Sequence, residues 1–208
     1  FPFGFGLGYT TFDVQTRQVS LDGARVSIDV DVTNTGGFPG KETIQVYASV
    51  PAGRLDQPLQ ALAGFTKTDE IAPGATARIT VDVDLTDLAS YDEASHATIL
   101  EAGRYLLRAG TSSRQLSPVA VVELAQDATV RHLAGDLGEP GFTDWKPEVP
   151  AVLDIPAGLP VLTVDPADLR LPDHAEPDEQ SALEGFSEAL TFARGLCDDE
   201  LVHIVLGD

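Results

Sequence analysis

Between residues 12 and 124, apolar and polar positions alternate along the chain with a period of two. In residues 25–33 every even position is apolar and every odd position is polar, which is typical of a strand with one buried face. The same pattern predicts further strands at 44–49, 59–71 (a weaker pair or an edge strand), 75–85 and 105–109, and the mostly apolar run 119–124 is interpreted as a more fully buried strand. Turn-forming residues separate these runs, and a short helical turn is expected at 86–88. About seven short strands with this spacing predict an antiparallel β-sandwich over residues 13–125.

Beyond residue 125 the composition changes. Residues 1–125 carry a net charge of −6, whereas residues 126–208 carry −14 and hold 8 of the 14 prolines. Each proline fixes φ and removes a backbone donor, so we expect residues 126–178 to form an extended, acidic connector, with one added strand around 161–164. Its recurring apolar residues are unusual for a flexible linker and indicate that it lies along a protein surface.

From Asp178 the hydrophobic period becomes 3.6 residues. Phe186 and Leu190 share one predicted helix face with three alanines, and Asp178 is suited to cap that helix. A second helix is expected to begin near Leu196, with Glu200 where a capping box places its acid. Residues 179–208 are therefore predicted to form a short C-terminal helical segment, while the chain as a whole is mainly β.

The first twelve residues follow neither period. Aromatic and apolar residues alternate there with glycines, which let neighbouring chain approach closely. Two interpretations are open: a decorated first strand of the sandwich, or a segment that packs into a groove of another domain, because each aromatic side chain can bury roughly 150–250 Å².

Residues 2–12 resemble the Pro-Phe-Gly-x-Gly-Leu-x-Tyr-Thr-x-Phe junction of β-glucosidase-like enzymes of glycoside hydrolase family 3. In that family the junction joins an α/β sandwich to a fibronectin type III-like domain. Further motifs of the fibronectin-like domain are matched in order at 32–37 with 40–42, 46–47, 54–58, 62–65, 85–88, 91–92, 101–105 and 109–113. Ala102 stands where the family has proline.

This resemblance implies that the chain is a fibronectin type III-like, non-catalytic part of an enzyme that hydrolyses β-glycosidic bonds with retention. Residues 196–201 resemble the helix that opens the family's (β/α)8 barrel, which implies a permuted domain order with the barrel after the connector. The partners would then be the α/β sandwich and the barrel of the same parent chain, with substrate reached only through the parent. The candidate interdomain contacts are Phe1, Phe3, Phe5, Leu7, Tyr9, Phe12, Phe186 and Leu190.

No residue of the chain is assigned a catalytic role. Asp144-Trp145 is superficially similar to the family's nucleophile motif, but the preceding residues 133–140 contain Gly, Asp, Glu and Pro, which disfavour a buried barrel strand. Glycoside hydrolysis needs two carboxyl groups that flank the scissile bond. Trp145 is kept as a sugar-stacking candidate, beside the simpler interpretation that it anchors the connector to a domain face.

The remaining polar candidates favour structural roles. The four histidines lack the spacing of metal ligands, and the paired acids Asp29/Asp31 and Asp82/Asp84 are expected on the solvent face of strands, so neither metal nor cofactor is predicted. Ser112-Ser113 is interpreted as a turn. The histidines are His96, His132, His174 and His203.

The net charge of −20 disfavours nucleic acid and anionic membranes as partners, since both bind clustered Lys and Arg. Cys197 is the single cysteine, so no internal disulfide forms; we interpret it as a buried or capping residue. A reducing compartment such as the cytoplasm is favoured, although the parent's compartment is left open. A stand-alone carbohydrate-binding or adhesion module is the alternative function. It would need a row of exposed aromatics, and of Tyr47, Tyr91, Tyr105 and the phenylalanines most are expected on buried faces or in the junction motif.

Overall fold

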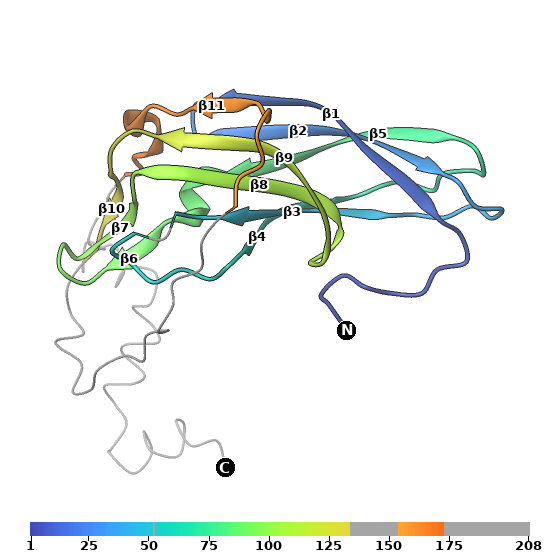
Figure 1. The fold of residues 1–208 in the computed structure, drawn as a ribbon, viewed down its shortest axis with the longest axis horizontal. Helices are drawn as coiled ribbons and strands as arrows, with labels where there is room; N and C mark the ends of the chain where they lie inside the picture. Colours follow the sequence, from blue (N-terminus) through green and yellow to red (C-terminus); the bar gives the residue numbers. More distant parts are fainter. Residues whose placement is uncertain (52, 134–153, 173–208) are drawn as a thin grey trace, which may run out of the picture. The chain divides into compact units, whose positions relative to one another are not determined.

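The computed structural model describes residues 1–51, 53–133 and 154–172 (Figure 1). The chain divides into two compact units, Phe1–Pro172 and Asp173–Asp208, and all of the described residues belong to the first. Its strands and short 3₁₀ helices are β1 (Phe12–Asp22), β2 (Arg25–Asn34), β3 (Thr43–Ser49), β4 (Ala61–Lys67), β5 (Thr76–Asp84), η1 (Leu85–Leu88), β6 (Ser90–Asp92), β7 (Ala97–Leu100), β8 (Gly103–Ser112), β9 (Gln115–Leu124), β10 (Ala128–His132), β11 (Val161–Thr163) and η2 (Pro166–Leu169).

Two sheets form the sandwich. One has the order β1-β2-β5, and the other has the order β11-β9-β8-β3-β4. All pairs are antiparallel except β11 with β9. A small third sheet, β10-β7-β6, lies at the end of the strands opposite the N-terminal residues (Figure 1). The antiparallel sandwich predicted from the alternation is confirmed, as is the edge position of the strand expected within 59–71, which is β4.

The core lies between the two sheets. Val26, Ile28, Val30 and Val32 of β2 are fully buried and pack in one cluster with apolar residues of β3, β5, β8 and β9. These are the even positions that the alternation assigns to the buried face. The short turn expected at 86–88 is η1, whose Thr86 N–H donates to the carboxylate of the N-cap residue Asp84.

The packed body does not end at residue 125. β10 pairs with β7, β11 pairs with β9, and Leu169 of η2 is fully buried in the core. The predicted connector therefore contributes two strands to the sheets. Only the strand near 161–164 was expected; β10 was missed because its alternation lasts five residues, too few to separate from the acidic sequence around it.

The predicted helices of residues 179–208 lie outside the described residues. Within the described ranges, neither of the two four-residue helices could cross a membrane.

Candidate interdomain surface

The N-terminal apolar segment, defined as residues 1–9, precedes β1 and carries exposed apolar side chains. Leu7 is 97% exposed and Tyr9 95%, and the rings of Phe1 and Phe5 stack with centroids 5.6 Å apart. Phe12 differs, because it starts β1 and packs against the core. Five of the six N-terminal contact candidates are thus exposed on this unit; the five are Phe1, Phe3, Phe5, Leu7 and Tyr9.

The backbone of this segment is held against the sandwich. The Ser113 N–H donates to the Phe3 carbonyl at 2.9 Å, in the turn between β8 and β9. Gly4 has a φ of 82° and passes over Gln45 so closely that a Cβ would lie 2.0 Å from the Gln45 amide nitrogen. Only glycine meets both conditions, which explains one glycine of the junction motif.

Asn34 ties Thr10, the residue that follows this segment, to two loops. Its side-chain oxygen accepts from the Thr10 hydroxyl at 2.6 Å and from the Gly36 N–H at 3.0 Å. Its amide nitrogen donates to the carbonyls of Phe38 and Ile71, both at 2.8 Å. Asn34 is fully buried and its side-chain hydrogen-bonding groups are all used. The asparagine of the matched motif at 32–37 therefore has a structural role.

Two open hollows flank Pro39 next to the segment. One has a volume of about 440 Å³ and is lined by residues 4–10 together with residues 39–42, Thr111 and others. The other has a volume of about 380 Å³ and is lined by Tyr9, Phe38, Pro39 and Glu70. Exposed aromatic side chains beside hollows are typical of a surface that contacts another protein part.

At the end of the strands opposite the N-terminal residues, Asp92 and Glu101 hold the loop that contains Arg54 and Leu55. Arg54, Asp92 and Glu101 belong to three different matched motifs. Nη1 of Arg54 donates to Asp92 Oδ1 at 2.5 Å, and the Glu101 carboxylate accepts from the N–H groups of Arg54 at 2.6 Å and Leu55 at 3.0 Å. The hydrogen bond from Arg54 is the largest effect that lowers the pKa of Asp92 from 3.8 to about 2. The Tyr105 hydroxyl donates to the Glu101 carbonyl at 2.6 Å, the arrangement known as a tyrosine corner in sandwich folds.

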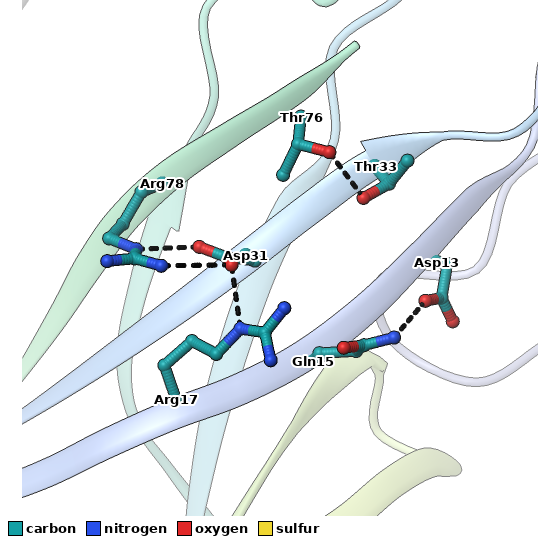
Figure 2. Close-up of polar contacts among 7 residues, drawn as sticks. All are labelled: Asp13, Gln15, Arg17, Asp31, Thr33, Thr76 and Arg78. Atoms are coloured by element: carbon teal, nitrogen blue, oxygen red, sulfur yellow. Dashed lines mark hydrogen bonds and ion pairs between the residues drawn. The ribbon is translucent and has the colours of Figure 1, made fainter. Parts of the chain in front are cut away.

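Asp31 departs from the sequence expectation. It lies on the outer face of β2, as the alternation predicts, but it is only 8% exposed because two arginines cover it (Figure 2). Arg78 donates to it from two nitrogens at 2.7 and 3.0 Å, and Arg17 from Nε at 2.7 Å. These hydrogen bonds, that of Arg78 first, lower its pKa to about 2. The face predicted for Asp31 is therefore right, but the two arginines bury its carboxylate there.

A β-bulge in β1 explains how Arg17 reaches Asp31. The register with β2 shifts at Arg17, which leaves this residue unpaired on the outer face. A signal in the sequence could have revealed it: the apolar residues of this strand are at even positions up to Val14 and at odd positions from Val19 onward.

The other paired acids serve the sheet or its turns. Asp29 accepts from the Thr80 hydroxyl, Asp82 accepts from Ser27, and Asp84 caps η1. Across residues 1–51, 53–133 and 154–172 no three His, Cys, Asp or Glu side chains are grouped so that they could hold a metal ion.

The remaining candidates fall in two groups. Nδ1 of His96 lies 3.3 Å from the Tyr91 hydroxyl, His132 ends β10, and Ser112 accepts from the Gln115 N–H in the predicted turn. The others lie outside the described residues: Asp144, Trp145, His174, Phe186, Leu190, Cys197 and His203.

A family model described as the fibronectin type III-like domain matches residues 42–113. These residues are a fibronectin type III-like domain. The chain is 36% identical over 129 residues to a β-glucosidase of Kluyveromyces marxianus, covering 61% of this chain and 15% of the relative. It is 38% identical over 134 residues to β-glucosidase A of Butyrivibrio fibrisolvens, covering 55% and 16%, and 33% identical over 133 residues to an exo-α-(1→6)-L-arabinopyranosidase of Bifidobacterium breve, covering 64% and 17%.

Solved structures of β-glucosidases are similar to the fibronectin-like domain as well. The Paenibacillus barengoltzii enzyme matches with a TM-score of 0.62 and 38% identity, covering 64% of this chain and 16% of that one. A family 3 β-glucosidase of Bifidobacterium adolescentis matches with a TM-score of 0.57 and 34% identity, covering 67% and 20%. The resemblance to the fibronectin-like part of family 3 enzymes is confirmed. The chain spans about one sixth of the length of the relatives it matches.

Proposed function

We propose that this chain is the non-catalytic, structural part of a family 3 glycoside hydrolase that cleaves terminal β-glycosidic bonds with retention. Its role is to brace the parent's catalytic domains against each other. A rigid brace matters because a displacement of about 1 Å in a catalytic group can lower a rate by roughly a hundredfold. The arabinopyranosidase among the relatives leaves the parent's sugar open, with glucose favoured by the other names.

The observation that carries this proposal is that the matched motif residues form hydrogen bonds within the sandwich itself. Asn34, Glu101 and Tyr105 are buried or half-buried, and their hydrogen bonds hold loops of the sandwich itself. A domain whose characteristic residues stabilise its own loops is suited to serve as a scaffold for chemistry performed elsewhere.

The N-terminal apolar segment would be one of the two seams of the brace. Its exposed side chains and the adjacent hollows support docking on the α/β sandwich that the junction motif implies. The second seam would involve Phe186 and Leu190 and the barrel, in a parent of permuted domain order. Residues 13–125 would form the fibronectin-like domain, to which the connector adds β10 and β11, and residues 179–208 would form the start of the barrel.

Activity of the parent enzyme tests the brace. The double change Leu7→Ser with Tyr9→Ser should lower kcat/KM on an aryl β-glucoside by about tenfold or more, because the apolar seam is lost. The matched control is Leu59→Ser, which changes another exposed leucine outside the segment. Equal activity of both variants would contradict the role of the segment.

The isolated 208-residue chain provides a second test. It should show no turnover of an aryl β-glucoside above buffer, and turnover by the pure chain would overturn the non-catalytic assignment.

A stand-alone carbohydrate-binding module is the alternative, favoured by the exposed stack of Phe1 and Phe5. Such a module needs exposed aromatic faces, but Tyr47 and Tyr105 are buried and Tyr91 is 44% exposed. Titration of the chain with cello-oligosaccharides, followed by the fluorescence of Trp145, separates the two functions. Saturable binding favours the module, and an unchanged spectrum favours the brace.

A further inference from the structure

Within residues 154–172, the chain from Pro160 to Val164 follows the edge of the larger sheet. The Val121 N–H donates to the Pro160 carbonyl at 2.9 Å, β11 then pairs in parallel with β9, and the Val164 N–H donates to the Glu123 carbonyl at 3.2 Å. Figure 1 draws the segment across β8 and β9 before it turns along the β9 edge. Hydrogen bonds to neighbouring strands thus hold this part of the chain from Pro160 onward.

The side chains of the same segment enter the core. Val164 is 3% exposed and Leu169 is fully buried, both in the cluster that contains Tyr105 and Leu124. A cavity of about 10 Å³, lined by Leu169 and its neighbours, lies at this junction, and its volume is about that needed for one water molecule. The contact is therefore close-packed.

A 3₁₀ turn aims Leu169 inward. The Asp165 carboxylate accepts from the Ala167 N–H at 2.9 Å, and Pro166 occupies the first helical position, where its missing N–H is not needed. After the turn, the Leu171 N–H donates to the Val130 carbonyl of β10 at 2.8 Å. The segment is therefore attached at its end as well as along β11.

We propose that residues 154–172 form a clasp, which fixes the position of residue 172 on the sandwich. The last hydrogen bond of the clasp is to β10, at the end of the strands opposite the N-terminal apolar segment (Figure 1). An attachment at each end makes the sandwich a spacer of constant length between the N-terminal apolar segment and residue 172. A surface-lying connector without a buried side chain could not do this, because it would shift along the sheet.

Hydrogen exchange of the unmodified 208-residue chain is the first test. The amides of Val121, Val164 and Leu171 should exchange about a hundredfold or more slowly than in an unstructured peptide, because their hydrogen bonds open only when the clasp detaches. Exchange of residues 160–172 at free-peptide rates would overturn the proposal. This measurement needs no variant and no activity, so it is independent of the function of the parent.

Two leucine substitutions form the second test. Leu169→Ala should lower the midpoint of thermal unfolding by roughly 5–15 °C and speed exchange of the clasp amides at temperatures where β2 stays protected. Leu59→Ala, at a leucine that is 62% exposed, should change neither quantity. Equal unfolding midpoints and equal exchange rates in the two variants would show that Leu169 does not anchor the clasp.

A distance measurement tests the fixed spacing. Spin labels are placed at Ala167→Cys in η2 and at Gly37→Cys, an exposed position in the loop that follows β2, in a Cys197→Ser background. The two labels should produce one narrow distance distribution. A broad distribution in the folded chain would contradict the clasp. Adding Leu169→Ala should broaden it, whereas Leu59→Ala should leave it unchanged.

Discussion

The Thr10 hydroxyl donates a 2.6 Å hydrogen bond to Asn34 Oδ1 across 24 residues of sequence. The bond joins the last residues before β1 to the end of β2. Through its amide nitrogen, Asn34 also holds the carbonyls of Phe38 and Ile71. A single buried side chain thus keeps the N-terminal residues and two loops in a constant arrangement.

Replacing this amide by a carboxylate should be strongly destabilising. Asn34→Asp keeps the shape and the acceptor for Thr10 but removes both donors, and it places a charge at a fully buried position. We expect a loss of roughly 2–4 kcal/mol in the free energy of unfolding, measured by urea denaturation. Thr33→Ala, at the half-buried neighbour, removes only the hydrogen bond with the Thr76 hydroxyl and should change it by no more than about 1 kcal/mol. Similar losses for the two variants would contradict the structural role of Asn34.

Gly64 belongs to the matched motif at 62–65, and its backbone lies against β5. A Cβ at this position would lie 2.4 Å from the Asp82 carbonyl oxygen, which is backbone and cannot move aside without shifting β5. Gly64→Ala should therefore lower the free energy of unfolding by roughly 1–3 kcal/mol. Gly37→Ala is the matched control, because a Cβ there meets open space. Thermal unfolding of both variants measures the difference in stability. Equal stabilities would show that β4 does not pack closely against β5.

Tyr105→Phe removes one hydroxyl and leaves the ring in the core. The Glu101 carbonyl then loses its donor, and we expect a loss of roughly 1–3 kcal/mol in the free energy of unfolding. The carboxylate of Glu101 also accepts from the N–H groups of Arg54 and Leu55. Because Tyr105→Phe loosens Glu101, protease cleavage in the loop around residues 54 and 55 should become faster in this variant. Tyr91→Phe, at a half-exposed tyrosine, is the control; a loop equally resistant in both variants would argue against the link.

Acid should destabilise the sandwich through Asp31 and Asp92. Arginine hydrogen bonds lower the pKa of each carboxyl from 3.8 to about 2 in the folded chain. A group whose pKa is lower when folded stabilises the fold above its unfolded pKa, so this contribution is present above about pH 4 and disappears as the pH falls to about 2.

Urea unfolding between pH 7 and pH 2 measures this effect. The double variant Asp31→Asn with Asp92→Asn should start less stable at pH 7 and lose less stability on acidification than the unmodified chain. Asp87→Asn, at an exposed carboxyl in η1, should keep the original pH profile. An unchanged profile for the double variant would show that other carboxyls govern acid unfolding.

The sequence pattern predicted the sandwich because a sheet with one buried face imposes a period of two on each strand. Residues 25–33 show this most clearly, and β2 is buried at the expected positions. The pattern could not predict contacts such as Arg54 with Asp92 or Arg54 with Glu101, which join residues 38 and 47 positions apart. Periodicity assigns a face to each residue, but the partner across a loop depends on how the sheets pack.

Two misses have a common physical cause. Arg17 was not recognised as a partner of Asp31 because one inserted residue reverses the faces of β1, and β10 was missed because five residues carry too little periodicity. In both places, tertiary packing overrides a weak local signal. The resemblance of the motif residues to a known family identified the domain where periodicity alone indicated only a sandwich.

The parallel pairing of β11 with β9 also has a consequence for biosynthesis. β9 can join β8 as soon as it leaves the ribosome, but β11 exists only after residues 125–160 have been translated, roughly 2–7 s later at 5–20 residues per second. During that interval β9 is an open edge that a neighbouring nascent chain could extend. Pro118 and the exposed Glu123 lie in β9, and both residue types disfavour such pairing. Both residues should therefore disfavour the pairing of β9 with a neighbouring chain until β11 emerges and pairs with residues 121–123.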